Sequence, residues 1–251
     1  MLDGKHALVT GGGTGIGLAI ARDLAAKGAV VTITGRRAEV LEAATAGAAG
    51  LFPLVMDVRD EAEVTGRIAE AVAARGPVQI CVANAGIAEG RALHKMDLDF
   101  WRAMMATNLD GAFLTIRECL GSMRETDWGR VIAVSSIAGL HGLRGASCYT
   151  ASKHGMVGLI RALSEDYLGQ PYTFNALCPG YVETEIIDRN INSIRARAGV
   201  SAQEAREIMV SANPHKRLIR PEEVAAAAAW LVGPGSESVN GQAIEIAGGR
   251  V

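Results

Sequence analysis

The sequence predicts an α/β protein with a doubly wound parallel sheet of about seven strands and helices on both faces. Short apolar runs rich in β-branched residues recur along the chain, and an amphipathic stretch follows most of them. The runs are apolar throughout rather than alternating, which is typical of strands buried on both faces of a parallel sheet. Right-handed crossovers between such strands then give a doubly wound arrangement.

The expected elements follow one another in a regular order. Strands are expected at 6–10, 30–34, 51–55, 78–83, 130–136, 172–178 and 242–247. Helices are expected at 15–27, 60–75, 99–124, 149–168 and 221–232. A helical but irregular insertion at about 183–216 interrupts the order, and at the carboxyl ends of the strands it could form a substrate lid. Because no Pro-, Gly- or Ser-rich linker divides residues 1–251, we expect a single domain.

The composition is that of a globular protein with no strong charge bias. Charged residues make up 21% of the chain, hydrophobic residues 49%, and the formal net charge is −2. No block of like charge is present, which argues against a nucleic-acid-binding or anionic-membrane surface. The longest apolar run, 224–232, is much shorter than the ~20 residues that span a bilayer. We therefore expect neither nucleic acid nor membrane among the partners.

The cysteines and the N-terminal segment indicate a reducing compartment. Cys81, Cys119, Cys148 and Cys178 form no CxxC motif and show no metal-ligand spacing with the histidines. Their neighbours are mostly apolar, which favours buried free thiols over disulfides or a metal site. The segment MLDGKHALVTGG contains no apolar run of signal-peptide length. The sequence thus predicts a cytoplasmic protein without a metal.

A glycine-rich turn, TGGGTGIG at 10–17, joins the first strand to the first helix. Glycines let a backbone turn tightly and approach a ligand, and free N–H groups at a helix start attract phosphate. The turn therefore indicates a pyrophosphate site, with a ligand-free tight turn as the alternative. The spacing of Gly11, Gly15 and Gly17 differs from GxGxxG, and no Lys-Ser/Thr follows as in a P-loop.

The ends of the second and third strands bear on the choice of dinucleotide. A carboxylate after the second strand would bind the 2′-hydroxyl of an adenosine ribose. Here Gly35 leaves room, and Arg36, helped by Arg37, suits a 2′-phosphate through charge-assisted bonds. This favours NADP(H), with NAD(H) possible, unless the arginines merely face water. Asp57 could bind the adenine amino group or be an ordinary turn residue.

A phenol and an ammonium lie one helical turn apart at Tyr149 and Lys153, so the two side chains can meet. With the other motifs, this pair makes the chain resemble the classical short-chain dehydrogenases/reductases. The stretches that carry the resemblance are TGGGTGIG (10–17), NAG (84–86), Asn108, Ser136, YTASK (149–153) and PGYVET (179–184). They run in the family's order over nearly the whole chain. The resemblance implies a Rossmann-like fold and hydride transfer between NAD(P) and a carbonyl or secondary alcohol.

Four residues have catalytic roles that the resemblance implies. Tyr149 would act as general acid in reduction or general base in oxidation, although a free phenol has a pKa of about 10. Lys153 and the positive nicotinamide ring would lower that pKa, and Lys153 would also bind the nicotinamide ribose. Ser136 would donate a hydrogen bond to the substrate oxygen. Asn108 would hold a water that links Lys153 to solvent, or it could be a helix-kink residue without that role.

Cofactor binding is expected along the strand ends that these motifs occupy. The expected residues are Gly11, Thr14, Gly15, Ile16, Gly17, Arg36, Arg37, Asp57, Val58, Asn84, Ala85, Gly86, Tyr149, Lys153, Pro179, Gly180, Val182 and Thr184. Among them Asn84 is expected to brace neighbouring strands rather than to touch substrate. Many family members that prefer NADP carry a basic residue where this chain has Thr14. The 2′-phosphate prediction therefore depends on Arg36.

The substrate pocket is expected to be largely apolar. The expected substrate residues are Ser136, Ile137, His141, Leu143, Tyr181 and Ile186. His141 could bind a polar group of the substrate or be a loop histidine without that role. The resemblance favours a 3-oxoacyl or 3-hydroxyacyl compound or a small ketone over a steroid or polyol. A dinucleotide-binding sensor without turnover is the alternative from another class, and the resemblance also implies a homo-dimer or homo-tetramer.

Overall fold

The computed structural model describes residues 2–185, 187, 191, 195 and 199–249. Its centre is one seven-stranded sheet in the order β3-β2-β1-β4-β5-β6-β7, and every neighbouring pair is parallel. The strands are β1 (His6–Thr10), β2 (Val30–Gly35), β3 (Leu51–Val55), β4 (Val78–Ala83), β5 (Gly129–Val134), β6 (Tyr172–Pro179) and β7 (Ala243–Ile246). The predicted fold class is therefore confirmed.

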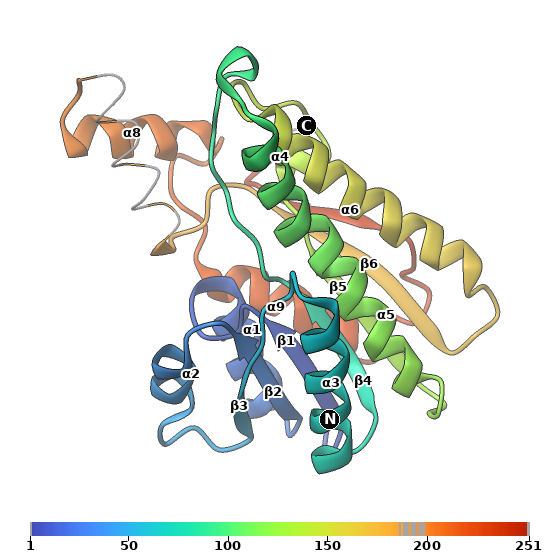
Figure 1. Ribbon diagram of the computed structural model, residues 1–251. Coiled ribbons are helices and arrows are strands. Elements are labelled where there is room, and N and C mark those ends of the chain that lie inside the picture. The colour runs from blue at the N-terminus through green and yellow to red at the C-terminus, as the bar shows by residue number, and fades with distance from the viewer. Residues whose placement is uncertain (1, 186, 188–190, 192–194, 196–198, 250–251) are drawn as a thin grey trace.

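Helices cover the sheet on both faces (Figure 1). They are α1 (Gly15–Ala26), α2 (Ala38–Thr45), α3 (Glu61–Arg75), α4 (Leu98–Met105), α5 (Gly111–Met123), α6 (Ser147–Asp166), α8 (Ala202–Ala212) and α9 (Pro221–Val232). One buried cluster joins α3, α5 and α6 to one face of the sheet, and another joins α1, α2 and α9 to the opposite face. Within β1, Leu8 belongs to the first cluster and Ala7 and Val9 to the second. This is the alternation of side chains that a strand imposes.

The helix predicted at 99–124 is interrupted, which is the main local difference from the sequence-based expectation. α4 and α5 are separated by a π-helical turn, Ala106–Asp110, and Asn108 lies inside that turn. Gly111 follows immediately, and a Cβ there would lie 2.7 Å from the side chain of Val58. π-helical turns of this kind are frequent at functional sites. α2 is a further element that the sequence analysis did not predict.

The segment expected to form a lid, 183–216, contains α8 and the turn that leads to α9. A small buried cluster under α8 consists of Ile187, Ile191, Ala205, Met209 and Leu218. α8 begins at a capping box in which Ser201 and Glu204 bind each other's backbone N–H groups. Figure 1 shows α8 beyond the sheet, apart from the two main helical layers. Part of the expected lid lies outside the described residues.

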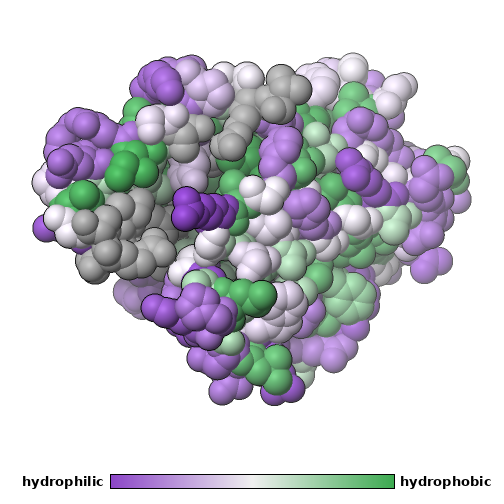
Figure 2. Space-filling view, turned by 90° about the horizontal axis from the view of Figure 1, so that it is seen from above, coloured by the Kyte–Doolittle hydropathy of each residue, from purple (hydrophilic) through white to green (hydrophobic). Residues whose placement is uncertain are grey.

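Hydrophobic residues lie both along the helices and over the surface of the described part of the chain. No helix there combines the length and the hydropathy that crossing a membrane requires. On the face seen in Figure 2, the coloured residues form several separate hydrophobic groups between hydrophilic ones. Large exposed hydrophobic side chains also include Leu93, Phe113 and Trp230.

Two glycine substitutions should have opposite effects on stability, because Gly17 packs closely in the glycine turn and Gly66 lies in open space. A Cβ on Gly17 would lie 2.3 Å from the carbonyl oxygen of Gly11 and 2.5 Å from Nδ2 of Asn84. Gly17→Ala should therefore lower the melting temperature by roughly 4 °C or more, because the turn must shift. Gly66→Ala, in an open position of α3, should raise it by about 2 °C through helix propensity.

Thermal unfolding followed by circular dichroism measures both effects in otherwise identical proteins. A Gly17→Ala protein as stable as the unchanged chain would contradict the close packing of the turn against β4.

Candidate active site

A cavity of about 860 Å³ opens along the carboxyl ends of the strands. Its walls come from the segments that follow β1, β2, β3, β4, β5 and β6, together with α6 and α8. Ligands bind at this edge of open α/β sheets, where the strand order reverses, here between β1 and β4. The volume is in the range of small-molecule and cofactor sites.

Ser136, Tyr149 and Lys153 meet in the wall of this cavity. Ser136 follows β5 and begins a 3₁₀ turn, where its hydroxyl accepts a hydrogen bond from the N–H of Ala138 at 3.1 Å. Tyr149 and Lys153 lie one turn apart on α6, and Nζ of Lys153 is 5.8 Å from the centre of the Tyr149 ring. Nζ also donates to the carbonyl oxygen of Val134 at 2.9 Å. Two elements thus bring together three residues that are distant in sequence.

Burial dominates the protonation equilibria of this group. It raises the pKa of Tyr149 above its ordinary value, and a hydrogen bond from Ser136 works against the increase. Burial also lowers the pKa of Lys153 to about 8, because the charged ammonium loses its hydration. In the protein without a cofactor, the pKa of Tyr149 is therefore raised, whereas the sequence-based expectation was that Lys153 helps to lower it. A lower pKa of Tyr149 requires a further positive charge in the cavity, such as the oxidised nicotinamide ring.

Asn108 lies behind the cavity wall and does not line it. Its side chain is fully buried, and its amide is fixed by the backbone of Ile87 and by the hydroxyl of Ser152. Oδ1 of Asn108 and Nζ of Lys153 lie 3.3 and 3.6 Å from the point where a Cβ on Gly86 would stand. A side chain at position 86 would therefore press against both residues, so the glycine lets Asn108 and Lys153 stand beside the same point of the backbone.

The glycine turn forms a cradle that fits the diphosphate of a dinucleotide. Gly11 and Gly15 have φ values of +62° and +53°, which disfavour other residues. A Cβ on Gly11 would lie 2.9 Å from Nδ2 of Asn84, and one on Gly15 would lie 3.1 Å from Thr184. Thr14 is the N-cap residue of α1, yet its side chain does not cap the helix. The first N–H groups of α1 are thus left for an anion.

Asn84 connects the turn to β4. Its Nδ2 donates to the carbonyl oxygens of Thr10 and Gly11 at 2.8 and 3.3 Å, and its backbone N–H donates to the hydroxyl of Thr10. This agrees with the bracing role expected for Asn84. Gly17 lies outside the cavity wall, where it allows α1 to pack against the turn.

At the adenosine end, the residues expected from the sequence are joined by Arg59, which the sequence analysis missed. Arg59 forms a two-pronged ion pair with Asp57, with Nη2 and Oδ2 at 2.6 Å. These bonds lower the pKa of Asp57, and nearby Arg36 adds to the effect. Nη2 of Arg37 lies 3.9 Å from Oε2 of Glu185. Arg36, in contrast, forms no ion pair within the residues described. The Asp-x-Arg spacing after the third strand is the signal that could have revealed Arg59.

The remaining expected cofactor residues line the same cavity. They are Ile16, Val58, Ala85, Gly86, Pro179, Gly180, Val182 and Thr184. Since the glycine cradle, the open space after β2 and this continuous wall fit a dinucleotide, these residues would hold one.

The expected substrate residues divide into three groups. Ile137, Leu143 and Tyr181 line the cavity with Ser136. His141 does not line it: Nε2 of His141 lies 3.6 Å from a carboxylate oxygen of Glu245 on β7. Ile186 lies outside the described residues.

Ile187, Ile208 and Met209 complete the apolar wall of the cavity. Ile187 and Met209 are apolar residues of the irregular insertion, but no sequence signal indicates which of them faces the cavity.

Comparisons with known proteins agree with this geometry. The sequence model of a family described as short chain dehydrogenase matches residues 5–194. The chain is 34% identical to a D-beta-hydroxybutyrate dehydrogenase of Cupriavidus necator, over 100% of this chain and 99% of that protein. It is 36% identical to a ketoacyl reductase of Streptomyces coelicolor, over 98% and 97%. It superposes with a TM-score of 0.94 on an actinorhodin polyketide ketoreductase crystallised with NADPH, with 35% identity and coverage of 98% and 96%.

The buried ammonium of Lys153 makes the stability of the fold depend on pH. Its pKa is about 8 in the folded chain and about 10.4 when unfolded, so the unfolded chain binds more protons between these values. The free energy of unfolding should therefore increase as the pH rises from about 8 to about 10. Lys153→Met removes this contribution. Its stability relative to the unchanged chain should fall by about 2 kcal/mol from pH 8 to pH 10.

Urea unfolding at a series of pH values from 7 to 10 tests this, with the exposed-lysine variant Lys95→Met as control. A stability difference between Lys153→Met and the unchanged chain that does not vary with pH would contradict the burial of a titrating ammonium.

Proposed function

The chain belongs to the short chain dehydrogenase family, and from this premise we propose that it reduces a 3-oxoacyl compound or a small ketone with NADPH. Membership makes it an NAD(P)-dependent oxidoreductase that interconverts a carbonyl compound and an alcohol. The observation that supports the proposed roles is the meeting of Ser136, Tyr149 and Lys153 in the wall of the cavity that contains the glycine cradle.

Each of the three residues has a defined task in carbonyl reduction. A bound NADPH supplies the hydride that adds to the carbonyl carbon. The hydroxyls of Ser136 and Tyr149 donate hydrogen bonds to the carbonyl oxygen, where negative charge accumulates. Tyr149 then transfers its proton to that oxygen and becomes a phenolate. In the reverse direction, the same phenolate removes the proton of the alcohol.

Lys153 supports the proton transfer in two ways. Its Nζ lies 5.8 Å from the centre of the Tyr149 ring, where a positive charge favours the phenolate that proton transfer leaves behind. Its pKa of about 8 lies close to neutrality, so it can both release and regain a proton under working conditions.

NADP(H) is the proposed cofactor, with Arg36 as the residue that recognises its 2′-phosphate. Arg36 is exposed, lies directly after β2 and lines the cavity beside Gly35, which has no side chain to fill the space. The side chain that would accept bonds from a free 2′-hydroxyl is absent at this position. The similar actinorhodin ketoreductase was crystallised with NADPH.

The substrate proposal is supported by the walls of the cavity and by the similar proteins. Ile137, Leu143, Tyr181 and Met209 give the cavity a mainly apolar lining near Ser136 and Tyr149. An acyl chain or a small ketone suits such a lining better than a polyol, whose hydroxyls would lose hydrogen bonds to water. Two of the similar proteins are named for hydroxybutyrate and ketoacyl substrates.

We also infer a homo-dimer or homo-tetramer located in the cytoplasm. The exposed apolar side chains of Phe113 on α5 and Trp230 on α9 support self-association, since large exposed apolar groups favour interfaces. The four cysteines are buried free thiols, which supports a reducing compartment.

Tyr149→Phe tests the proton-transfer role with a minimal change of shape. The variant should fold and bind NADPH, while kcat for ketone reduction should fall by about 10²–10⁴-fold because the acid is missing. Tyr167→Phe, in the hydrophobic cluster beside Tyr172 and Phe174, is the matched control and should retain turnover. Absorbance at 340 nm follows both. Residual kcat of Tyr149→Phe within a few fold of the unchanged enzyme would refute the general-acid role.

Arg36→Ala tests the cofactor preference. Loss of charge-assisted bonds to the 2′-phosphate should raise the Kd for NADPH about 10–100-fold, with less than a twofold change for NADH. Arg67→Ala, which removes an exposed arginine of α3, serves as the control. Fluorescence titration of the reduced cofactors gives the four constants. Equal losses for NADPH and NADH would reject the contact with the 2′-phosphate.

A further inference from the structure

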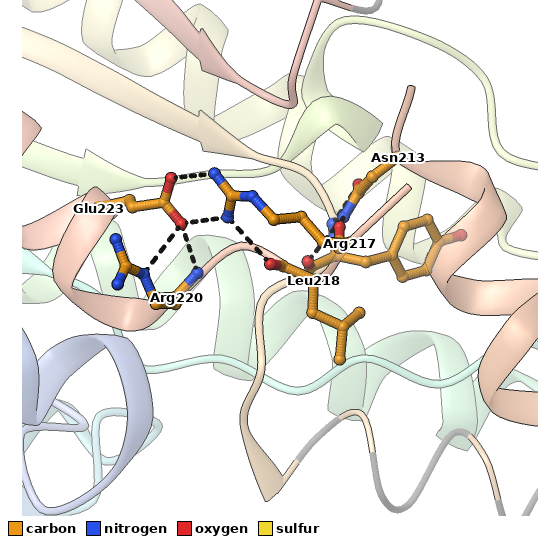
Figure 3. A network of polar contacts seen from close by, with 6 residues as sticks. Asn213, Arg217, Leu218, Arg220 and Glu223 are labelled. Atoms are coloured by element: carbon orange, nitrogen blue, oxygen red, sulfur yellow. Dashed lines mark hydrogen bonds and ion pairs between the residues drawn. The ribbon is translucent and has the colours of Figure 1, made fainter. Parts of the chain in front are cut away.

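A buried amide, Asn213, lies at the C-terminal end of α8 and binds both the backbone N–H and the backbone carbonyl group of one cavity residue. Its Oδ1 accepts a hydrogen bond from the N–H of Tyr181 at 3.1 Å, and its Nδ2 donates to the carbonyl oxygen of Tyr181 at 3.0 Å. Nδ2 also donates to the carbonyl oxygen of Arg217 at 2.8 Å. Only 1% of Asn213 is exposed, so these bonds replace water completely. Figure 3 shows Asn213 beside Arg217 in this network.

The segment that Asn213 holds leaves the sheet and has few other supports. The N–H of Gly180 donates to the carbonyl oxygen of Ile246, and beyond it a parallel bridge joins Val182 to Ile219. In this bridge the N–H of Ile219 donates to the carbonyl oxygen of Tyr181 at 2.9 Å, and the N–H of Glu183 donates to that of Ile219 at 2.8 Å. A Cβ on Gly180 would lie 2.7 Å from Oδ1 of Asn213, so the glycine is what lets the amide approach. Asn213 and the bridge to Ile219 therefore fix the position of residues 180–183 together.

The opposite end of the network is fixed to α9. Arg217 forms two bonds with the carboxylate of Glu223, at 2.6 and 2.7 Å, and that carboxylate accepts the N–H of Arg220 at 2.8 Å (Figure 3). These bonds lower the pKa of Glu223 to about 2, with the Arg217 bond the largest cause. The carbonyl group that Asn213 binds on Arg217 therefore belongs to a turn clamped to the start of α9.

The Asn213 side chain thus joins two parts of the cavity wall, segment 179–184 and α8. Segment 179–184 resembles the family segment that orients the nicotinamide carboxamide, and Ile208 and Met209 of α8 line the same cavity. We propose that Asn213 is a positioning residue that sets the Tyr181 peptide, and with it the carboxamide-binding segment, relative to α8 and α9. This proposal rests on the proposed function of the same cavity.

The proposal predicts a loss of affinity that depends on the nicotinamide half of the cofactor. In Asn213→Ala the Kd for NADPH should rise about 10-fold. The Kd for 2′-phospho-ADP-ribose, which lacks the nicotinamide, should change less than twofold, because the glycine cradle and Arg36 are untouched. Isothermal titration calorimetry measures both ligands on the full chain.

Asn175→Ala is the matched control. Asn175 is also 1% exposed, and its amide likewise joins two backbone groups, the carbonyl of Val239 and the N–H of Gln242, but it lies outside the cavity. Its replacement should reduce stability and leave both dissociation constants within twofold. If Asn213→Ala does not fold, Asn213→Asp replaces it, since the carboxylate keeps the acceptor for Tyr181 and loses both donated bonds.

Two results would overturn the inference alone: equal losses for NADPH and 2′-phospho-ADP-ribose, or an unchanged affinity for NADPH. Failure of the unchanged chain to bind either ligand would instead overturn the proposed function, and the inference with it.

Discussion

The proposed chemistry depends on how a half-buried phenol and a buried ammonium share one cavity wall. Burial works against the charged form of both groups: it raises the pKa of Tyr149 and lowers that of Lys153 to about 8. Nζ of Lys153 lies 5.8 Å from the centre of the Tyr149 ring and gives its hydrogen bond to Val134, and burial has the largest effect on the pKa of Tyr149. The chain by itself therefore keeps the phenol protonated, which is the form that carbonyl reduction consumes.

The sheet explains why such a wall can form from distant residues. Seven parallel strands end at one edge, so the segments after β1, β4, β5 and β6 converge there. The glycine turn brings backbone N–H groups to this edge, and Asn84 ties the turn to β4. Ser136 stands at the end of β5, and α6 then places Tyr149 and Lys153 beside it. The same edge continues into the Tyr181 peptide, which Asn213 holds against the end of α8.

Sequence reasoning predicted the fold, because continuous apolar strands and helical periodicity are local signals. It also named the residues at the strand ends, because the glycine turn, Ser136 and the Tyr149–Lys153 pair have recognisable spacings. It did not predict the π-helical turn around Asn108, whose amide is fixed by Ile87 and Ser152 from other parts of the chain. Arg59 and Asn213 escaped it for the same reason, since their importance comes from tertiary partners. The balance between burial and charge at Tyr149 likewise depends on the packed cavity.

The pKa of the Tyr149 phenol, measured with and without NADP⁺, tests the electrostatic explanation. Ultraviolet difference titration of the unchanged chain against a Tyr149→Phe reference isolates this phenol from the other three tyrosines. The expected result is a pKa above 10 in the free protein and a clearly lower one with NADP⁺ bound, because the positive ring stabilises the phenolate. A pKa that does not fall when NADP⁺ binds would show that charge in the cavity does not control ionisation of the phenol.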